Sequence, residues 1–483
     1  MLIASRLSRT DAPVAAVAAA GHEVLLAGDD DRAIGELVAR ARDYDPAAHG
    51  GRRLDIYAVF DSEAPLRLMQ TAGVGADVLA RADILATTID DLCAKTVLVR
   101  LPGIDSDFPA LDREPISRDS DSTVQLVIFG DSPQTDALAI NAALVAHYPN
   151  YCRDPRLRTR ITIVDDHAFA IRDRLVQRYP HLFANSCYRT IDLRAQDPAP
   201  ILHRPENLAR LGDFVDVEWE FVRGDSRSAA VCRKLSEWSC SPRRQLTVAL
   251  CSADQDANVA EALSLPAELY RRGVTVLCRT DGHAAIDLAR STGAYDSLRA
   301  FGVQSCSIET LRRLKALGRG INYVYSHSFA LPADAPLAPP AVIDREAMRE
   351  LWYGIGSLSK RYSNIFGAMT FGSKMHSLGH TDPATDTYYA LSISEIDTLT
   401  EVEHNRWSTE ELILGYRPVT ASEQAAIEAD ISLKKRLRDS EKAHYDLRAF
   451  ADLRPDATGK PVEIYDKVLT QAIPLIVKTC ITD

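Results

Sequence analysis

The sequence lacks several features that mark particular classes of protein. Its 56 Lys and Arg are outnumbered by 67 Asp and Glu, for a formal net charge of −11 at pH 7. That balance excludes a general nucleic-acid binder, which needs a basic footprint to neutralise phosphates. The short basic run 434–438 sits among acids, which favours a solvated helix face over an anion contact. No stretch approaches the roughly 18 uninterrupted apolar residues of a membrane-spanning helix, so we expect no membrane span.

The cysteines show no spacing pattern typical of disulfide or metal sites. The nine cysteines are scattered, with no CxxC pair and no paired spacing, which predicts reduced thiols. Cys251 and Cys278 lie at the ends of apolar runs and are expected to be buried small hydrophobes. The first residues also lack the apolar stretch of a secretory signal. These observations predict a cytoplasmic protein.

What is present is an ordinary globular composition. The chain has 483 residues, 46% hydrophobic and 25% charged, enough for two or three domains with real cores.

Short apolar runs alternate with helical patterns through the first three hundred residues or so. The runs are 23–28, 54–60, 96–101, 125–130, 160–166, 246–251 and 274–280. Several are continuous, as in strands buried on both faces, and helical patterns such as 136–147 and 257–272 lie between them. This predicts an α/β fold with a doubly wound, mostly parallel sheet. Segment 213–222 alternates instead and is predicted to be an edge strand with one face in solvent.

The character of the sequence changes near residue 305. Helical patterns dominate at 344–378 and 394–480, and 331–340 holds four prolines in ten residues, which predicts an extended, semi-rigid connector. We therefore expect a leading α/β region of unknown role (1–120), an α/β domain (121–304), a helical connector with a Pro-rich linker (305–343) and a helical domain (344–483).

A strand–turn–helix passage after residue 125 has the frame of a dinucleotide-binding turn. Against the pattern G-x-G-x-x-G, the chain offers Gly130, Ser132 and Thr135, so only the first glycine is present. Asp131 would place a carboxylate where phosphates sit, and Pro133 removes a backbone N–H. The turn is either a helix start capped by Ser132 or Asp131, or a real nucleotide crevice.

Two further strand ends supply candidate nucleotide-binding residues. Asp165 and Asp166 end the next strand, the place where an acid holds a ribose in dinucleotide-binding domains. Ser252 and Asp254 follow a later strand, and such carboxyl-end loops line the ligand crevice of a doubly wound sheet. Ordinary strand-end acids explain the first pair equally well, and a helix cap at Asp256 explains the second without any ligand.

The stretch EVEHNRWSTEELILGYRP (401–418) predicts a helix. We expect it to start at Thr398 or Thr400 and to end at Gly415 in a left-handed cap. Glu401 and His404 approach the pattern of a metal-binding helix, but a second histidine four residues on is missing, so we predict no metal site.

The polar residues of this helix fall on two neighbouring faces. One face is expected to carry Glu403, Arg406 and Glu410, and the other His404, Trp407, Ser408 and Glu411. An Arg beside an indole can stack on it, and the indole N–H seeks a hydrogen-bond partner. From these residues alone, the cluster could be a catalytic site, a ligand pocket or an internal clamp.

The motifs of this region resemble those of a known module. Residues 403–407 (EHNRW), followed by 415–417 (GYR), resemble the RyR domain, which is repeated in ryanodine receptors and occurs singly in many prokaryotic proteins. HYDLRAFADL (444–453) and IYDKVLTQAIPLI (464–476) resemble its later segments, and 351–379 resembles the segment that precedes it in bacterial members. The N-terminal part of those proteins is similar to TrkA-N, the nucleotide-binding domain of potassium-transport regulators, and 121–304 resembles that architecture.

The resemblance implies a non-catalytic regulatory protein that senses a nucleotide or nucleotide-derived signal and signals to a protein partner. The setting would be potassium-transport-type regulation or phage defence. NAD(H) or another adenine nucleotide is the implied ligand, and because TrkA-N domains pair, a homodimer is expected. The implied ligand-binding residues of the RyR-like part are Asn364, Lys374, Glu403, Arg406, Trp407, Tyr416 and Arg417.

Within that set, the resemblance divides the roles by chemistry. Trp407 or Tyr416 would stack a base, and Arg406, Arg417 or Lys374 would hold a phosphate. Two other functions stay open. One is an NAD(P)-dependent oxidoreductase, which needs a working phosphate turn. The other is a protein-interaction module with a degenerate nucleotide site, favoured by Asp131 and Pro133.

Overall fold

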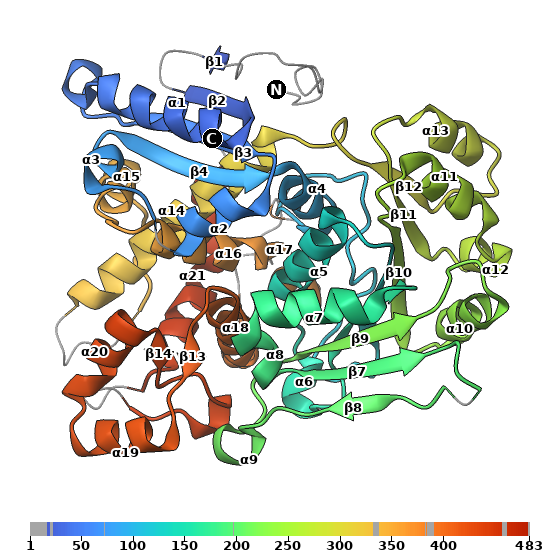
Figure 1. Ribbon diagram of the computed structural model, residues 1–483. Coiled ribbons are helices and arrows are strands. Elements are labelled where there is room, and N and C mark those ends of the chain that lie inside the picture. The colour runs from blue at the N-terminus through green and yellow to red at the C-terminus, as the bar shows by residue number, and fades with distance from the viewer. Residues whose placement is uncertain are drawn as a thin grey trace.

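The computed structural model describes residues 17–19, 23–71, 73–196, 198–331, 338–381, 383, 391–455 and 461–481. Two sheets occupy the first part of the chain and helices the last part (Figure 1). Most of the predicted connector at 331–340 lies outside the described residues. Within the described ranges, no helix combines the length and apolarity needed to cross a bilayer.

The leading region forms a four-stranded sheet. Its strands, in spatial order, are β1 (Val17–Ala19), β2 (Glu23–Gly28), β3 (Leu54–Phe60) and β4 (Ala82–Thr88). Strands β2, β3 and β4 are parallel, and β1 is antiparallel at the edge. The helical segments of this region are α1 (Asp30–Asp43), η2 (Pro46–His49), α2 (Glu63–Thr71), α3 (Ala76–Leu79) and α4 (Ile89–Leu98).

Helix α4 corrects one predicted strand. The run 96–101 is the end of α4 and the residues after it, not a strand. Thr88 caps the helix by accepting the Asp91 N–H at 3.0 Å, and Val97 and Leu98 are buried. A short apolar run does not by itself distinguish a strand from a buried helix end.

The second sheet has eight strands and is mostly parallel, as the sequence predicts. Their spatial order is β12 (Leu298–Phe301), β11 (Thr275–Arg279), β10 (Arg244–Leu250), β5 (Thr123–Phe129), β6 (Thr159–Asp165), β9 (Val217–Arg223), β7 (Cys187–Asp192) and β8 (Ile201–His203). Only the short edge strand β8 pairs antiparallel among the described strands of this sheet. The chain order reverses between β5 and β10, the switch point at which open α/β sheets bind ligands.

Both faces of this sheet are covered by helices. Leu126 and Ile128 of β5 pack in one core with Ile171, while Val127 and Phe129 pack in the other with Leu235. The helices between β5 and β9 are α5 (Pro133–Val145), α6 (Asn150–Arg153), α7 (Ala168–Arg178), α8 (Pro180–Asn185) and α9 (Leu208–Leu211). Those after β9 are α10 (Ala229–Cys240), α11 (Gln255–Ser264), α12 (Ala267–Arg271) and α13 (Ala284–Ser291). The single helix predicted over 257–272 is therefore two, because Pro266 separates them.

Strand β9 corrects a second prediction. Segment 213–222 was expected at an edge, but β9 lies between β6 and β7. Its polar residues Glu218 and Glu220 are buried. Arg189 donates to Glu218 at 2.7 Å, Arg160 also pairs with Glu218, and Thr162 donates to Glu220 at 3.1 Å. Hydrogen-bond and ion-pair partners on neighbouring strands, which local alternation does not reveal, take the place of solvent.

Helices build the last part of the chain. They are α14 (Ile308–Ala330), α15 (Arg345–Tyr353), α16 (Leu358–Met369), α17 (Phe371–Ser377), α18 (Ile393–Ile413), α19 (Ala421–Ala429), α20 (Ser432–Glu441), η4 (Phe450–Asp452) and α21 (Ile464–Ile481). A two-residue parallel pair joins β13 (Arg417–Pro418) to β14 (Ala443–His444).

Helix α18 covers residues 401–413 of the predicted 401–418 helix but begins earlier, and Arg417–Pro418 form strand β13 instead. Ser392 caps α18 in a capping box with Glu395, so the predicted start at Thr398 or Thr400 is wrong. Ser392 carries the same Ser/Thr-x-x-Glu signal, about two turns further from the motif. Gly415 has φ 87°, which confirms the left-handed conformation after the helix.

One cysteine pair corrects the prediction of reduced thiols. Cys93 of α4 and Cys306, just before α14, form a disulfide with a Cα–Cα distance of 5.5 Å. Their separation of 213 residues hides the pair from any argument on local spacing. Cys251 and Cys278 are buried free thiols, as expected.

Candidate ligand-binding site

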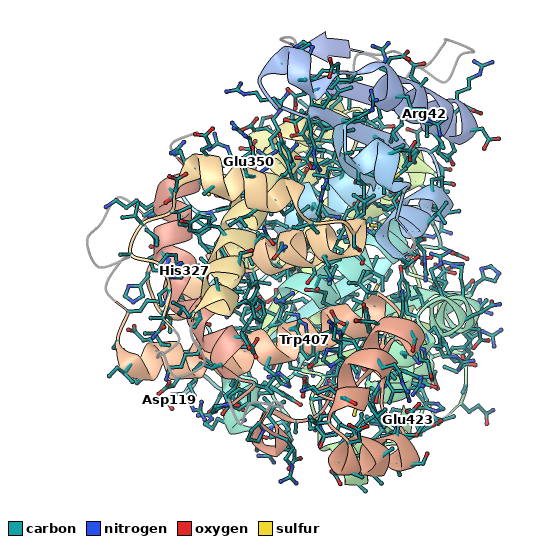
Figure 2. All side chains as sticks on the ribbon, turned by 90° about the vertical axis from the view of Figure 1, so that its left-hand side faces the viewer. Arg42, Asp119, His327, Glu350, Trp407 and Glu423 are labelled. Atoms are coloured by element: carbon teal, nitrogen blue, oxygen red, sulfur yellow. A yellow bond between two sulfur atoms is a disulfide. The ribbon has the colours of Figure 1, made fainter. Side chains whose placement is uncertain are left out.

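A cavity of about 680 Å³ lies among the helices of the last part of the chain. We call it the helical cavity. Its walls come from α14, α16, α18, α20, β14 and α21. In the view of Figure 2, Trp407 of α18 lies among the helices that form this side of the molecule. The cavity is large enough for a ligand of nucleotide size.

Aromatic side chains form one part of the wall. Trp407 is half-buried, and the His444 ring stands edge-on to it, with ring centroids 4.8 Å apart and planes at 75°. Phe329 of α14 is 65% exposed and lies 4.9 Å from the ring of Tyr465. Such rings provide surfaces on which a planar base can stack.

Basic side chains of α20 form another part. Lys434 pairs with Asp446 at 2.9 Å, and Arg438 bonds the adjacent, exposed Asp439 at 3.0 Å. Lys435 is exposed, and no ion pair to it is present among the described residues. The run expected to be a solvated helix face therefore also borders the cavity, where its charges can meet an anion.

A buried ion-pair cluster closes the inner wall. Arg406 is 3% exposed; its Nε donates to Glu403 at 3.0 Å, and its Nη1 pairs with Glu410. Lys374 is 1% exposed and also pairs with Glu403. Burial disfavours the Glu403 carboxylate, but Arg406 and Lys374 outweigh it and lower the pKa of Glu403 to about 2. These ion pairs connect Arg406 and Glu403 of α18 to Lys374 of α17.

The pKa values of the two histidines of the wall are shifted in opposite directions. Burial lowers the pKa of His444 to about 4, so this imidazole is neutral at pH 7. Burial also disfavours the charged form of His404, but Asp466, with its Oδ2 3.6 Å from Nδ1, raises the pKa of His404 above its ordinary value. The Nε2 of His404 lies 2.8 Å from the Arg448 carbonyl, which orients the ring.

Only some of the predicted ligand-binding residues of the RyR-like part line the helical cavity. Asn364, Glu403, Arg406 and Trp407 line it. Three predicted residues do not: Lys374 lies behind Glu403, Tyr416 packs beside Lys442, and Arg417 pairs with Glu423 at 2.7 Å. Their predicted stacking and phosphate contacts have no place at this cavity.

Sequence reasoning missed several lining residues. Lys435 and Arg438 had a local signal, the basic run itself, but its position relative to Trp407 depends on tertiary structure. Tyr325 and Tyr465 come from α14 and α21 and carry no local pattern that points to a ligand.

The predicted dinucleotide turn is closed by its own contacts. Gly130 has φ 101°, and a Cβ there would lie 2.5 Å from the Ser252 backbone nitrogen. Ser132 caps α5 by accepting the Thr135 N–H, as one of the two alternatives predicts, and its hydroxyl donates to the Cys251 carbonyl. Asp131 pairs with Arg174 at 2.8 Å. The N-terminus of α5 is thus occupied by protein groups rather than open to a phosphate.

The other strand-end residues have local roles. Asp165 accepts the His167 N–H at 2.7 Å, and Asp166 pairs with Arg194. The Ser252 N–H donates to Asn258 at 2.9 Å. Asp254, not the predicted Asp256, caps α11 by accepting the Ala257 N–H at 3.1 Å.

Comparisons with known proteins give no information on the site. No family model, curated protein or solved structure matches this chain. Among the residues whose positions are described, no cluster of three or more His, Cys, Asp or Glu is arranged to hold a metal ion.

Proposed function

We propose that this protein is a non-catalytic sensor that binds a nucleotide or nucleotide-derived molecule in the helical cavity. One observation carries the proposal: an aromatic wall containing Trp407 and a basic wall from α20 face the same cavity of about 680 Å³. A nucleotide has a planar aromatic base and an anionic phosphate, so it matches both walls. The overall negative charge of the chain makes this local basic edge more selective for a small anion than for nucleic acid.

The way in which a nucleotide would bind follows from which side chains are available to contact it. The base stacks on Trp407, and the phosphate meets Lys435 and Arg438. Arg406 takes no part in this contact, because Glu403 and Glu410 already hold its guanidinium. Arg438 exchanges a surface pair with Asp439, worth less than about 1 kcal/mol, for a contact with the phosphate.

The pKa values of Glu403 and His444 favour binding rather than acid–base chemistry by these two residues. A general acid or base works best with a pKa near the operating pH. Glu403 has its pKa lowered to about 2 and His444 to about 4, so both stay in one protonation state near neutrality. Fixed charges of this kind suit recognition.

The signal would pass through α19 and α20. These helices form a small lobe with its own core, made by Val419, Ile427, Leu437, Ala443 and Tyr445. A ligand held between Trp407 of α18 and Lys435 of α20 bridges this lobe to the main helices. Binding would therefore shift the lobe's position relative to α18, and a partner protein would detect that shift.

The proposal also includes the identity of the two main parts of the fold. The order β9-β6-β5-β10-β11-β12 follows the 3-2-1-4-5-6 order of a Rossmann-like sheet, which supports a TrkA-N-like middle part. The motif helix α18 packs against α21, which carries the last of the resembling segments, and this supports an RyR-like helical part.

Calorimetry of the full chain with ATP, NAD, ADP-ribose and cyclic nucleotides tests the proposal. We expect at least one to bind, and Trp407→Leu and the double variant Lys435→Ala/Arg438→Ala each to weaken that binding at least tenfold. The double variant should also reduce the salt dependence of the affinity, because it removes the charges that meet the phosphate.

Lys360→Ala is the matched control. Lys360 is exposed on α16, a helix that lines the cavity, but is not itself a lining residue. It should bind like the parent. Failure of every nucleotide in the panel to bind folded protein would refute the proposal, as would equal weakening by the control.

A further inference from the structure

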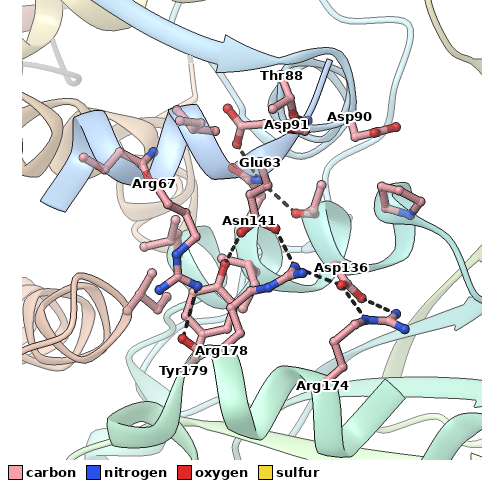
Figure 3. A pocket seen from close by; sticks show the side chains of 18 of the residues that line it. Glu63, Arg67, Thr88, Asp90, Asp91, Asp136, Asn141, Arg174, Arg178 and Tyr179 are labelled. Carbon is pink, nitrogen blue, oxygen red and sulfur yellow. Dashed lines mark hydrogen bonds and ion pairs between the residues drawn. The ribbon is translucent and has the colours of Figure 1, made fainter. Parts of the chain in front are cut away.

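A second cavity, of about 510 Å³, lies where the two sheets meet. We call it the inter-sheet pocket. Residues after β3, at the end of β4 and after β5 line it, together with α2, α5 and α7 (Figure 3). The carboxyl ends of strands from both sheets thus open into one space, the common position of ligands in α/β proteins. The helical-cavity proposal does not use this space.

The lining of this pocket is predominantly acidic. Its charged residues are Asp61, Glu63, Asp90, Asp91, Asp131 and Asp136 against Arg67, Arg174 and Arg178. The pocket therefore has an excess of negative charge, which disfavours a phosphate at the end of β5.

Two of the arginines are already held by carboxylates. Arg174 donates to Asp131 at 2.8 Å and to Asp136 at 2.9 Å. Arg178 donates to Asp136 at 3.0 Å and also pairs with Glu63 (Figure 3). These pairs fix one side of the pocket and leave no guanidinium from this side directed at an anionic ligand.

Asn141 supplies an independent sign of a missing ligand group. Its side chain is 2% exposed, and its Nδ2 donates to Asp91 at 3.0 Å and to the Ala137 carbonyl at 2.9 Å. Both partners are acceptors, so the amide orientation is fixed and the oxygen is left over. No donor reaches this oxygen within the described residues. A buried acceptor without a donor is energetically unfavourable, and a ligand N–H can remove this cost.

A second acceptor, Asp90, lies at the start of α4. Among the described residues, no ion pair compensates its half-buried carboxylate. Burial raises the pKa of Asp90, and the neighbouring Asp91 and Asp281 add to the rise against the opposing charge of Arg279. A cation beside Asp90 would relieve this unfavourable environment.

The remaining wall is apolar. Leu66, Ile140, Leu144, Phe366 and Ile413 line it. A fitting ligand therefore needs an apolar body as well as hydrogen-bond donors and positive charge, and a hydrated metal ion lacks the first of these.

We infer that the inter-sheet pocket is a second binding site, and that its ligand is an organic cation in which amine or guanidine groups are joined by an alkyl chain, as in a polyamine. The N–H groups satisfy Asn141 Oδ1, the positive charge faces Asp90 and its acidic neighbours, and the methylenes pack on the apolar wall. At the place where a doubly wound sheet binds an anionic dinucleotide, the excess of carboxylates in the lining thus favours a ligand of the opposite charge.

Calorimetry and thermal unfolding with spermidine, putrescine and agmatine test this inference. We expect at least one amine to bind the full chain and raise its melting temperature. Asn141→Leu, which keeps the side-chain size and removes the amide oxygen, and Asp90→Asn should each weaken binding at least tenfold. Nucleotide affinity at the helical cavity should stay unchanged in both, so the two proposals can fail separately.

Asp256→Asn is the matched control for charge. Asp256 and Asp90 both lie in the first turn of a helix, α11 and α4 respectively, but Asp256 is exposed and lies outside the pocket. It lowers the net negative charge equally and should bind amines like the parent. No binding of any of the three amines would overturn the inference, and so would binding that Asp90→Asn and the control change equally. If Asn141→Leu does not fold, Asp90→Asn alone decides.

Discussion

Glu411 is a residue whose ionisation is strongly affected by the fold. It lies on α18 and is 8% exposed. Burial, and then the nearby carboxylate of Glu410, raises the pKa of Glu411 to about 8 from an ordinary value of 4.5. At pH 7 this side chain is therefore protonated in the folded protein and ionised in the unfolded chain.

Glu411→Gln should stabilise the protein at pH 8 and have little effect at pH 4.5. Between these pH values the folded state binds one more proton at this site than the unfolded state, so Glu411 makes the free energy of unfolding fall as pH rises. Above about pH 8 both states are ionised and the difference between variant and parent becomes constant. Urea unfolding across this pH range measures that difference; a pH-independent gap would contradict the expectation.

Arg406 should be essential for stability in a way that Arg417 is not. Arg406→Met leaves the buried Glu403 with only Lys374 and removes the ion pair of the buried Glu410, and breaking a buried pair in this way costs about 3–5 kcal/mol. Arg417, whose side chain is 26% exposed, pairs with Glu423, and Arg417→Met should cost less than about 1 kcal/mol. Urea unfolding compares the two, and similar losses would show that Arg406 is not a clamp.

Contacts between residues could be predicted from the sequence where helical spacing alone brings the residues together. Helical periodicity placed Glu403, Arg406 and Glu410 together, and these residues do bond one another. The fourth member, Lys374, is 29 residues from Glu403 in sequence and joins it only through tertiary packing. The same limit applied to Lys435, whose position beside Trp407 depends on where α20 packs.

At the scale of elements, continuous apolar runs were the most reliable signal. All the predicted strands are present except 96–101. Strand β4 was missed because its apolar run is interrupted by Asp83 and ends in two threonines. Strand β7 was missed because it mixes polar and apolar residues. In each case partners elsewhere in the chain, rather than the local pattern, make the strand.

Gly130→Ala should be strongly destabilising. Its φ of 101° is one that residues with a side chain rarely adopt, and the added methyl would lie 2.5 Å from the Ser252 backbone nitrogen, so β5 and β10 would have to separate. We expect a loss above about 3 kcal/mol, because strain of this kind alone costs about 1–3 kcal/mol. Gly35→Ala, in the exposed face of α1 with nothing nearby, should instead stabilise by about 0.5–1 kcal/mol. Thermal unfolding of both variants checks the pair.

At the scale of the whole molecule, the two proposed sites share their supporting helices. Asn364 of α16 and Trp407 of α18 line the helical cavity, while Phe366 and Ile413 of the same helices line the inter-sheet pocket. If either helix moves when one ligand binds, the lining of the other site therefore changes as well. Any such coupling must be reciprocal, since each ligand changes the affinity of the other by the same factor.

One buried carboxylate of the leading sheet is shared by several side chains of the helices. Asp83 of β4 is fully buried and accepts the Trp352 Nε1–H at 2.9 Å, Arg361 at 3.0 Å and Arg319 at 2.6 Å. Lys315 of α14 lies 3.6 Å away. Burial disfavours its ionised form, but these cations outweigh it and hold the pKa of Asp83 far below its ordinary range.

Asp83→Asn should loosen the attachment of the leading sheet to the rest of the chain. Removing the charge leaves several buried cations without their common partner, which should cost about 3–5 kcal/mol. Asp77→Asn, which alters an exposed pair with Arg42 in the same region, should cost less than about 1 kcal/mol. Urea unfolding gives both values, and hydrogen exchange should show β2, β3 and β4 losing protection before β5 and β10 in Asp83→Asn alone. Uniform loss of protection across both sheets would mean that Asp83 stabilises the molecule as a whole and does not act as the joint between its parts.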